Sequence, residues 1–144
     1  MYQTIALFAV LVLLARYRFR IVPADVRIVD GDTVRVRGDD WRLTGFDAPE
    51  WDQPGGKAST AHLATILRSG HTLAILRGLD AYDRPLATLI TTRGPLSWRM
   101  ALAGHAHGEG LVCSTLTLVA RIARRGMWGM PGTIRPRNWR AGLR

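Results

Sequence analysis

Apolar and polar residues alternate through much of the first two thirds of the chain, and this alternation predicts β-strands. Neighbouring side chains on a strand point to opposite faces, so a period of two marks a strand with one buried face. Glycine, aspartate and proline residues separate the alternating segments and predict turns between them. Residues 21–45 have strand character throughout. The predicted strands are residues 33–37, 41–44, 72–76 and 86–91.

Apolar residues at helical spacing predict three helices. The first covers residues 57–69, where apolar side chains recur at i, i+3 and i+4. The second begins at Pro95 and closes at Gly104, and Ser114 caps a third helix that Gly126 stops. Strands that come first, followed by interleaved and then terminal helices, predict a small α+β barrel in a single domain.

The N-terminal residues form a separate apolar segment. Ile5–Ala15 is an unbroken run of eleven apolar residues, and three arginines follow within five positions. As a helix this run spans about 17 Å, less than the roughly 30 Å of a bilayer core, so residues 1–20 give a marginal membrane span. We expect residues 1–20 to be a signal anchor, residues 21–140 to form the domain, and residues 141–144 to be a basic end. A cleaved signal peptide and a buried core helix are the alternatives.

The anchor leaves the location of the domain open. Arginines after the apolar run favour a cytoplasmic C-terminus. A secreted type of enzyme would instead lie outside the membrane, and cleavage of the segment would release it as a secreted or periplasmic protein. The expected association with a membrane therefore depends on the N-terminal segment.

The charge of the chain is strongly positive. It has 20 Lys and Arg residues against 11 Asp and Glu, a formal net charge of +9 and a pI of about 11.3. Nine arginines and a single acid, Glu109, follow position 92. Such a field suits a polyanionic partner, either nucleic acid or an anionic membrane surface. Cys113 is the only cysteine, which excludes an intramolecular disulfide and a cysteine zinc site.

The scarce acids are concentrated in one short segment. Residues 30–52 contain seven of the eleven Asp and Glu residues. Asp30 and Asp32 are two apart and would face the same side of a strand, while Asp47 and Glu50 follow the next predicted strand. Oxygen ligands of this kind suit a hard divalent cation such as Ca²⁺. With Arg42 and the more distant Arg84 as phosphate clamps, the group would be complementary to a phosphodiester; a merely solvated set of turns is the alternative.

Several segments resemble, in order and spacing, the motifs of the staphylococcal nuclease (thermonuclease) family. The resemblance covers about residues 22–140. It implies a five-stranded OB-type Greek-key β-barrel with about three packed helices. The segments that carry it are Asp30–Val34, Arg42–Glu50, Gln53–Pro54, Asp80–Ala87, Leu102–Ala106, Arg125–Trp128 and Pro136–Arg140.

The resemblance also implies roles for the acidic residues. Asp32 and Asp47 would bind Ca²⁺ through their carboxylates, and the backbone carbonyl of Ala48 would be a third protein ligand. Asp30 would hold metal-bound water. Glu50 would act as the general base or position the attacking water.

Basic and aromatic residues complete the implied site. Arg42 and Arg84 would stabilise the transition state at phosphorus and its leaving group. Tyr82 and Trp51 are further candidates for contact with substrate, Trp51 as a stacking surface beside the acidic segment. The implied activity is a Ca²⁺-dependent endonuclease that cleaves DNA and RNA with low sequence specificity and leaves 3′-phosphate ends. We expect a monomer without a protein partner.

Two positions and one segment depart from the family pattern. Ala48 stands where the family's type member has threonine, which leaves a carbonyl ligand in place. Asp83 replaces the usual glycine before Arg84, and its carboxylate could compete with phosphate for that arginine. The segment after Gly104 is short and lacks the tyrosines that often line the nucleotide pocket.

Other assignments compete with this one. A non-catalytic, nuclease-like OB-type module that binds nucleic acid is the main alternative, although Arg42, Asp47, Glu50 and Arg84 are all retained. A face that docks on anionic lipid is a weaker one. His105 and His107 have the spacing of a metal pair but no third ligand nearby in the sequence.

Overall fold

The computed structural model of the chain describes residue 5, residues 18–23 and residues 25–143. The predicted N-terminal anchor therefore lies almost entirely outside the described residues. Arg18–Ile21 belong to a strand, β1, that pairs with β6 (Thr72–Leu79). No helix in the described part of the chain combines the length and the apolar character needed to cross a membrane.

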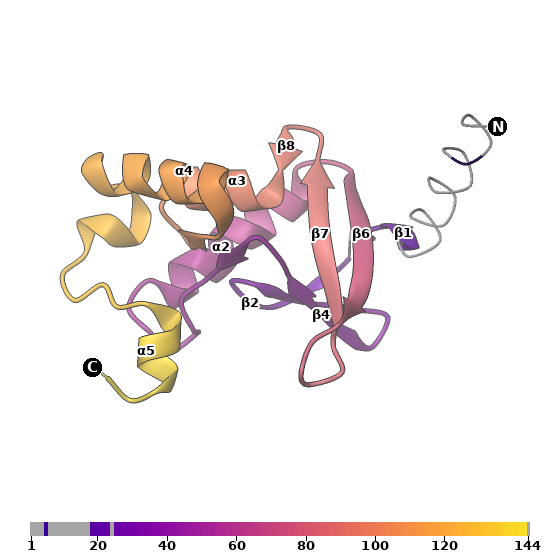
Figure 1. Ribbon diagram of the computed structural model, residues 1–144, viewed down its shortest axis with the longest axis horizontal. Coiled ribbons are helices and arrows are strands. Elements are labelled where there is room, and N and C mark those ends of the chain that lie inside the picture. Colours follow the sequence, from indigo (N-terminus) through magenta and orange to yellow (C-terminus); the bar gives the residue numbers. More distant parts are fainter. Residues whose placement is uncertain (1–4, 6–17, 24, 144) are drawn as a thin grey trace.

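The described residues form one large sheet with helices against it (Figure 1). The strands follow one another in the order β1-β6-β7-β4-β3-β2, with β8 beside β7. All neighbours are antiparallel except β4 and β7, which run parallel. The remaining strands of this sheet are β2 (Arg27–Asp30), β3 (Thr33–Val36), β4 (Asp39–Leu43), β7 (Pro85–Thr91) and β8 (Gly94–Pro95). A second, two-stranded sheet joins β5 (Phe46–Asp47) to β9 (His107–Gly108).

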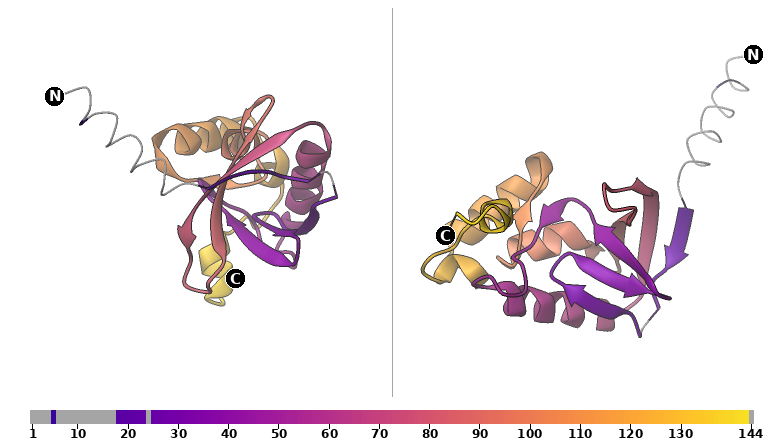
Figure 2. Two further views of the ribbon diagram at one scale, coloured as in Figure 1. Left: turned by 90° about the vertical axis from the view of Figure 1, so that its right-hand side faces the viewer. Right: turned by 90° about the horizontal axis from the view of Figure 1, so that it is seen from below.

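Helices gather on one side of this sheet, as two further views also show (Figure 2). Four α-helices lie in the described part of the chain, and a short 3-10 helix, η1, follows α4. The side chains of Leu63, Ile66 and Leu67 on α2 are buried and belong to the same core as those of the sheet. The helices in the described part of the chain are α2 (Gly56–Arg68), α3 (Leu96–Leu102), α4 (Gly110–Ile122), η1 (Gly126–Gly129) and α5 (Pro136–Arg140).

The structure corrects the predicted closed barrel. The α+β class is confirmed, but the sheet is open, because its end strands β1 and β2 pair with only one neighbour each among the described strands. Core side chains such as Val34, Leu43 and Leu63 occupy the space between the twisted sheet and α2. The helix thus covers the apolar face that closure of the barrel would otherwise have buried.

The limits of two predicted helices also need correction. α3 begins at Leu96, so Pro95 is the residue before the helix rather than its first residue. α4 begins at Gly110, four residues before Ser114, because Glu109 takes the extended conformation of the residue that precedes a helix. Ser114 consequently lies inside α4 and donates a hydrogen bond to the carbonyl of Gly108 at 3.3 Å.

Candidate functional site

The turn between β2 and β3 places the carboxylate of Asp32 inside the protein. Gly31 precedes it at a point where α2 packs directly on the turn. A Cβ atom at position 31 would lie 2.4 Å from the Ser59 hydroxyl oxygen and 2.6 Å from the Cβ of Ala48, so only glycine fits there. As a result Asp32 is only 3% exposed.

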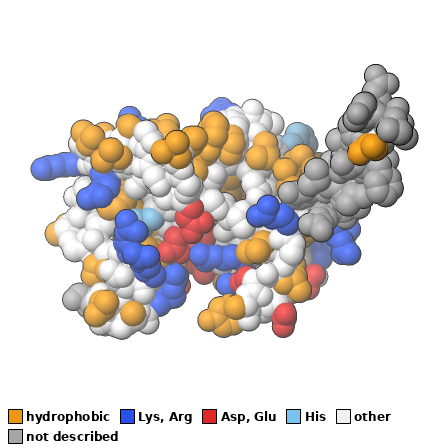
Figure 3. Space-filling view, viewed as in Figure 1, with side chains coloured by type: hydrophobic (Ala, Val, Ile, Leu, Met, Phe, Trp, Pro, Cys, Tyr) orange, Lys and Arg blue, Asp and Glu red, His pale blue; other side chains and the backbone are white. Residues whose placement is uncertain are grey.

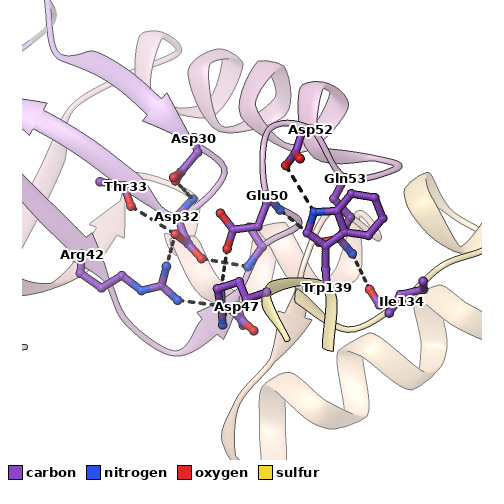
Figure 4. A network of polar contacts seen from close by, with 12 residues as sticks. Asp30, Asp32, Thr33, Arg42, Asp47, Glu50, Asp52, Gln53, Ile134 and Trp139 are labelled. Carbon is purple, nitrogen blue, oxygen red and sulfur yellow. Dashed lines mark hydrogen bonds and ion pairs between the residues drawn. The ribbon is translucent and has the colours of Figure 1, made fainter. Parts of the chain in front are cut away.

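Hydrogen bonds from three directions fix the Asp32 carboxylate. The backbone N–H of Ala48 donates to Oδ2 at 3.0 Å, and the Thr33 hydroxyl donates to Oδ1 at 3.2 Å. A guanidinium N–H of Arg42 donates to the same Oδ1. Figure 4 shows this carboxylate in the middle of the polar network.

The surroundings of Asp32 disfavour its negative charge. Burial raises the pKa of Asp32 from 3.8 to about 7. The charge of Arg42 and the hydrogen bond from Ala48 oppose this rise, whereas the charges of Asp30 and Asp47 add to it. The positive charge of Arg42 therefore does not compensate for the burial of this carboxylate.

Arg42 links the two carboxylates that the sequence assigned to a cation. Strand pairing sets Arg42 opposite Thr33, next to Asp32, so its side chain reaches the turn. One nitrogen of its guanidinium binds Asp32, and Nη2 donates to Oδ1 of Asp47 at 3.0 Å. A positive group thus lies in contact with both carboxylates, and the region favours a cation.

A rigid loop carries Glu50 to the same region. The backbone N–H of Glu50 donates to Oε1 of Gln53 at 3.2 Å, and the N–H of Gln53 donates to the carbonyl of Glu50 at 2.9 Å. Gln53 is 4% exposed and its amide donates to the carbonyl of Ile134 at 2.6 Å. At Gly56 a Cβ atom would lie 1.8 Å from the carbonyl oxygen of Glu50, so α2 starts in direct contact with the loop.

Arg140 on α5 is a site residue that the sequence did not reveal. Its guanidinium donates to Oε1 of Glu50 at 2.5 Å and lies 3.5 Å from Oδ1 of Asp47. Burial lowers the pKa of Arg140, but the hydrogen bond to Glu50 and the charges of the nearby carboxylates outweigh it and raise that pKa. Ninety residues separate Arg140 from Glu50, so no local pattern could have linked them. The family-like segment 136–140 was the only available signal.

Arg84 and Tyr82 lie in the turn between β6 and β7, beside the strand that carries Arg42, and among the described residues they contact none of the three carboxylates Asp32, Asp47 and Glu50 through a hydrogen bond or ion pair. The Arg84 guanidinium donates to Asp80 at 2.8 Å and lies 5.4 Å from the centroid of the Tyr82 ring. Tyr82 is 80% exposed. The expected competitor, Asp83, has φ 60°, and it is Asp80 rather than Asp83 that holds Arg84. In the described structure the predicted clamp thus binds a carboxylate of its own turn.

Asp32 and Asp47 converge on one guanidinium, but they are not part of a larger group of acidic side chains among the described residues. Among the described residues no group of three or more His, Cys, Asp or Glu side chains is arranged to hold a metal ion. The predicted ligand set needs only two carboxylates and the Ala48 carbonyl, with water for the rest. A buried carboxylate with a raised pKa, bridged to a second one by a guanidinium, has the chemistry of such a set.

The histidines have different partners. The ring of His105 stacks on His62 with centroids 4.4 Å apart, and His107 meets Trp128 edge-on at 4.8 Å. Burial lowers the pKa of all three histidines, to about 4 for His62 and His107. They pack as neutral rings and do not converge on one point.

The acidic group lies in a basic surround. Figure 3 shows Asp and Glu side chains gathered in a hollow at the centre of one face, with Lys and Arg side chains on both sides. A phosphate chain entering this hollow would be attracted by the rim and would meet the carboxylates only at the bottom.

Comparisons with known proteins show that this chain is similar to bacterial proteins. Protein ParB of Escherichia coli is 33% identical over 135 residues, which cover 80% of this chain and 76% of that protein. Two proteins called uncharacterized endonuclease, from Escherichia coli O157:H7 and Escherichia coli, are each 29% identical over 125 residues, covering 80% of this chain and 82% of theirs. No family model matches the chain.

Proposed function

This chain belongs to the same family as Protein ParB of Escherichia coli, and on that premise we propose that it is an endonuclease. The names of the two uncharacterized endonucleases support this activity. The proposed substrates are DNA and RNA, cleaved with low sequence specificity and with Ca²⁺ as the cofactor. The non-catalytic binding module remains the competing hypothesis.

One observation carries the proposal. Asp32, Asp47 and Glu50 approach one another in a protein of net charge +9, and arginine side chains join all three. Carboxylates that only kept the protein soluble would lie on the surface, yet Asp32 is buried. A buried acid whose charge is disfavoured has a stability cost, and such costs are concentrated at functional sites.

The acidic residues would have different roles in metal binding and proton transfer. A Ca²⁺ ion held by Asp32, Asp47 and the Ala48 carbonyl would offset the charge of the phosphate and make nearby water more acidic. Asp30, which accepts a hydrogen bond from the N–H of Asp32 at 3.1 Å, would orient water at the edge of this group. Glu50 would accept a proton from the water that attacks phosphorus.

The arginines would bind the phosphate. Arg42 would exchange its contact with the two carboxylates for the phosphate oxygens when a cation replaces it there. Arg84 would leave Asp80 in the same manner and stabilise the leaving 5′ oxygen. The water oxygen forms a new bond to phosphorus while the bond from phosphorus to the 5′ oxygen breaks. That oxygen takes a proton from solvent, which matches the proton that Glu50 accepts, so the products are a 3′-phosphate and a 5′-hydroxyl and one water is consumed.

The decisive experiment is cleavage by the full chain. Supercoiled plasmid and a labelled single-stranded oligonucleotide are incubated with Ca²⁺ or with chelator, and the ends are identified by sensitivity to a 3′-phosphatase. We expect cleavage with Ca²⁺ and none with chelator. Glu50→Gln should lower kcat by about 10²- to 10⁴-fold, as loss of a general base does.

Asp39→Asn is a matched control, because Asp39 is an exposed acid of the same segment outside the network. It should leave cleavage unchanged. Equal cleavage with and without chelator would contradict the metal-dependent mechanism. Binding to the oligonucleotide without cleavage in any divalent cation would instead identify a non-catalytic binding module.

A further inference from the structure

A cavity of about 720 Å³ opens beside Glu50, on the side of the C-terminal helix. Two tryptophans line it: Trp51, the residue after Glu50, and Trp139, the residue before Arg140. It is separate from the short segment after Gly104, from which the sequence lacks nucleotide-lining tyrosines. Small-molecule sites generally have volumes of this size and combine apolar walls with a few polar groups.

The two indole rings are held in different ways. Trp139 is half-buried, and its ring N–H donates a hydrogen bond to Oδ1 of Asp52 at 3.3 Å. This bond orients the indole ring and gives the Asp52 carboxylate a partner. Trp51 is 53% exposed, which is high for so large an apolar side chain outside an interface. An exposed tryptophan next to a site residue is the arrangement of a stacking surface.

The wall of the cavity carries one basic side chain, Lys57, besides the acid Asp52. The ammonium of Lys57 lies 5.9 Å from the centroid of the Trp51 ring. Lys57 forms no ion pair with any of the described residues. Trp51 and Lys57 also border a second hollow of about 490 Å³, whose wall carries Arg27 and Arg68 as well as the acid Asp25. A ligand with an aromatic ring and an anionic backbone matches both features.

We propose that the cavity lined by Trp51 and Trp139 is a nucleobase subsite, which takes the base of a nucleotide adjacent to the phosphate that is cleaved beside Glu50. This inference rests on the proposed function for the nature of the ligand. The base would stack on Trp51 at the open side, and Lys57 would attract the flanking phosphate. A base can enter the cavity only when it is not stacked on the neighbouring bases of its own strand.

Binding, rather than cleavage, tests the subsite. The full chain is titrated in chelator with two fluorescent single-stranded oligomers of equal length, one with thymine bases and one abasic throughout. Both carry the same phosphates, so the ratio of their Kd values isolates the bases. We expect the base-carrying oligomer to bind about 5- to 100-fold more tightly, as stacking on an aromatic residue predicts.

Three variants locate the effect. Trp51→Ala should remove most of the preference for bases, and Trp51→Phe should retain much of it. Trp98→Ala is the matched control, because Trp98 is 46% exposed on α3 and does not line the cavity; it should keep the full ratio.

The outcomes separate this inference from the proposed activity. An unchanged ratio in Trp51→Ala, equal Kd values for both oligomers in the unmodified chain, or no binding at all would each overturn the subsite. A protein that never cleaves but loses its base preference in Trp51→Ala would refute the nuclease and keep the subsite. Cleavage with Ca²⁺ together with an unchanged ratio would do the reverse.

Discussion

Replacement of Asp32 by asparagine should stabilise the metal-free protein while it abolishes the response to Ca²⁺. Burial raises the pKa of this carboxyl group from 3.8 to about 7. Between these two values the folded protein keeps a proton that the unfolded chain has lost. The free energy of unfolding therefore falls as the pH rises through this window, and the full loss is present above pH 7.

The size of the effect follows from the shift. One pKa unit corresponds to about 1.4 kcal/mol, so ionised Asp32 costs the folded state about 4 kcal/mol at pH 8. Asparagine carries no charge and can still accept the hydrogen bond from Ala48. Arg42 loses one anionic partner and keeps Asp47, which offsets part of the gain. We expect a net increase of about 1–3 kcal/mol in the free energy of unfolding.

Urea denaturation followed by tryptophan fluorescence measures this quantity. In chelator the advantage of Asp32→Asn should be largest at pH 8 and should shrink as the pH falls toward 4. With Ca²⁺ at about 100 times its Kd, the unmodified protein should gain about 2.7 kcal/mol and Asp32→Asn nothing. The control variant Asp39→Asn replaces an exposed acid, so it should change neither the free energy of unfolding in chelator nor the gain with Ca²⁺.

The opposite order at pH 8 would refute this reasoning. If Asp32→Asn were less stable than the unmodified protein in chelator, the ion pair with Arg42 would outweigh the cost of burying the charge. The site would then be a structural salt bridge. A Ca²⁺ response that survives in Asp32→Asn would remove this carboxylate from the proposed ligands.

Three further predictions test other parts of the molecule. Arg140→Ala removes a half-exposed guanidinium that pairs with two acids, so it should lower the free energy of unfolding by about 0.5–1 kcal/mol and speed limited proteolysis of α5; unchanged proteolysis would contradict its anchoring role. Burial lowers the pKa of His62 to about 4, so as the pH falls from 6.5 to 4 the unfolded chain binds this proton before the folded protein does, and the free energy of unfolding should drop. In urea titrations His62→Asn should reduce this dependence of the free energy of unfolding on pH. An equal dependence in the variant would show that the ring is accessible to water. Asp83→Gly should leave kcat/KM unchanged, whereas Asp80→Ala should lower it about 10-fold or more, because the Asp80 carboxylate accepts the backbone N–H groups of Tyr82 and Arg84 and so shapes the turn that presents Arg84. A gain in Asp83→Gly at low salt would restore Asp83 as the competitor.

The sequence by itself determined the elements that depend on local pattern. Alternation at 33–36 and helical spacing at 56–68 each record which face must be buried, so β3 and α2 appear where they were predicted. Asp32 and Arg42 also meet through local structure, since a tight turn joins β3 to β4 and fixes their register.

Only the tertiary structure decided the contacts between distant segments. The packing of helices against the sheet decides that the sheet is open, where α5 docks, and that Gln53 donates a hydrogen bond to Ile134. The local pattern of apolar and polar residues does not contain this information. Side-chain partners were equally undetermined: Arg84 binds Asp80, and Arg140 reaches Glu50 across ninety residues. A charged side chain takes the nearest suitable partner that the folded backbone offers, so the sequence supplies the charges and the packing decides their pairing.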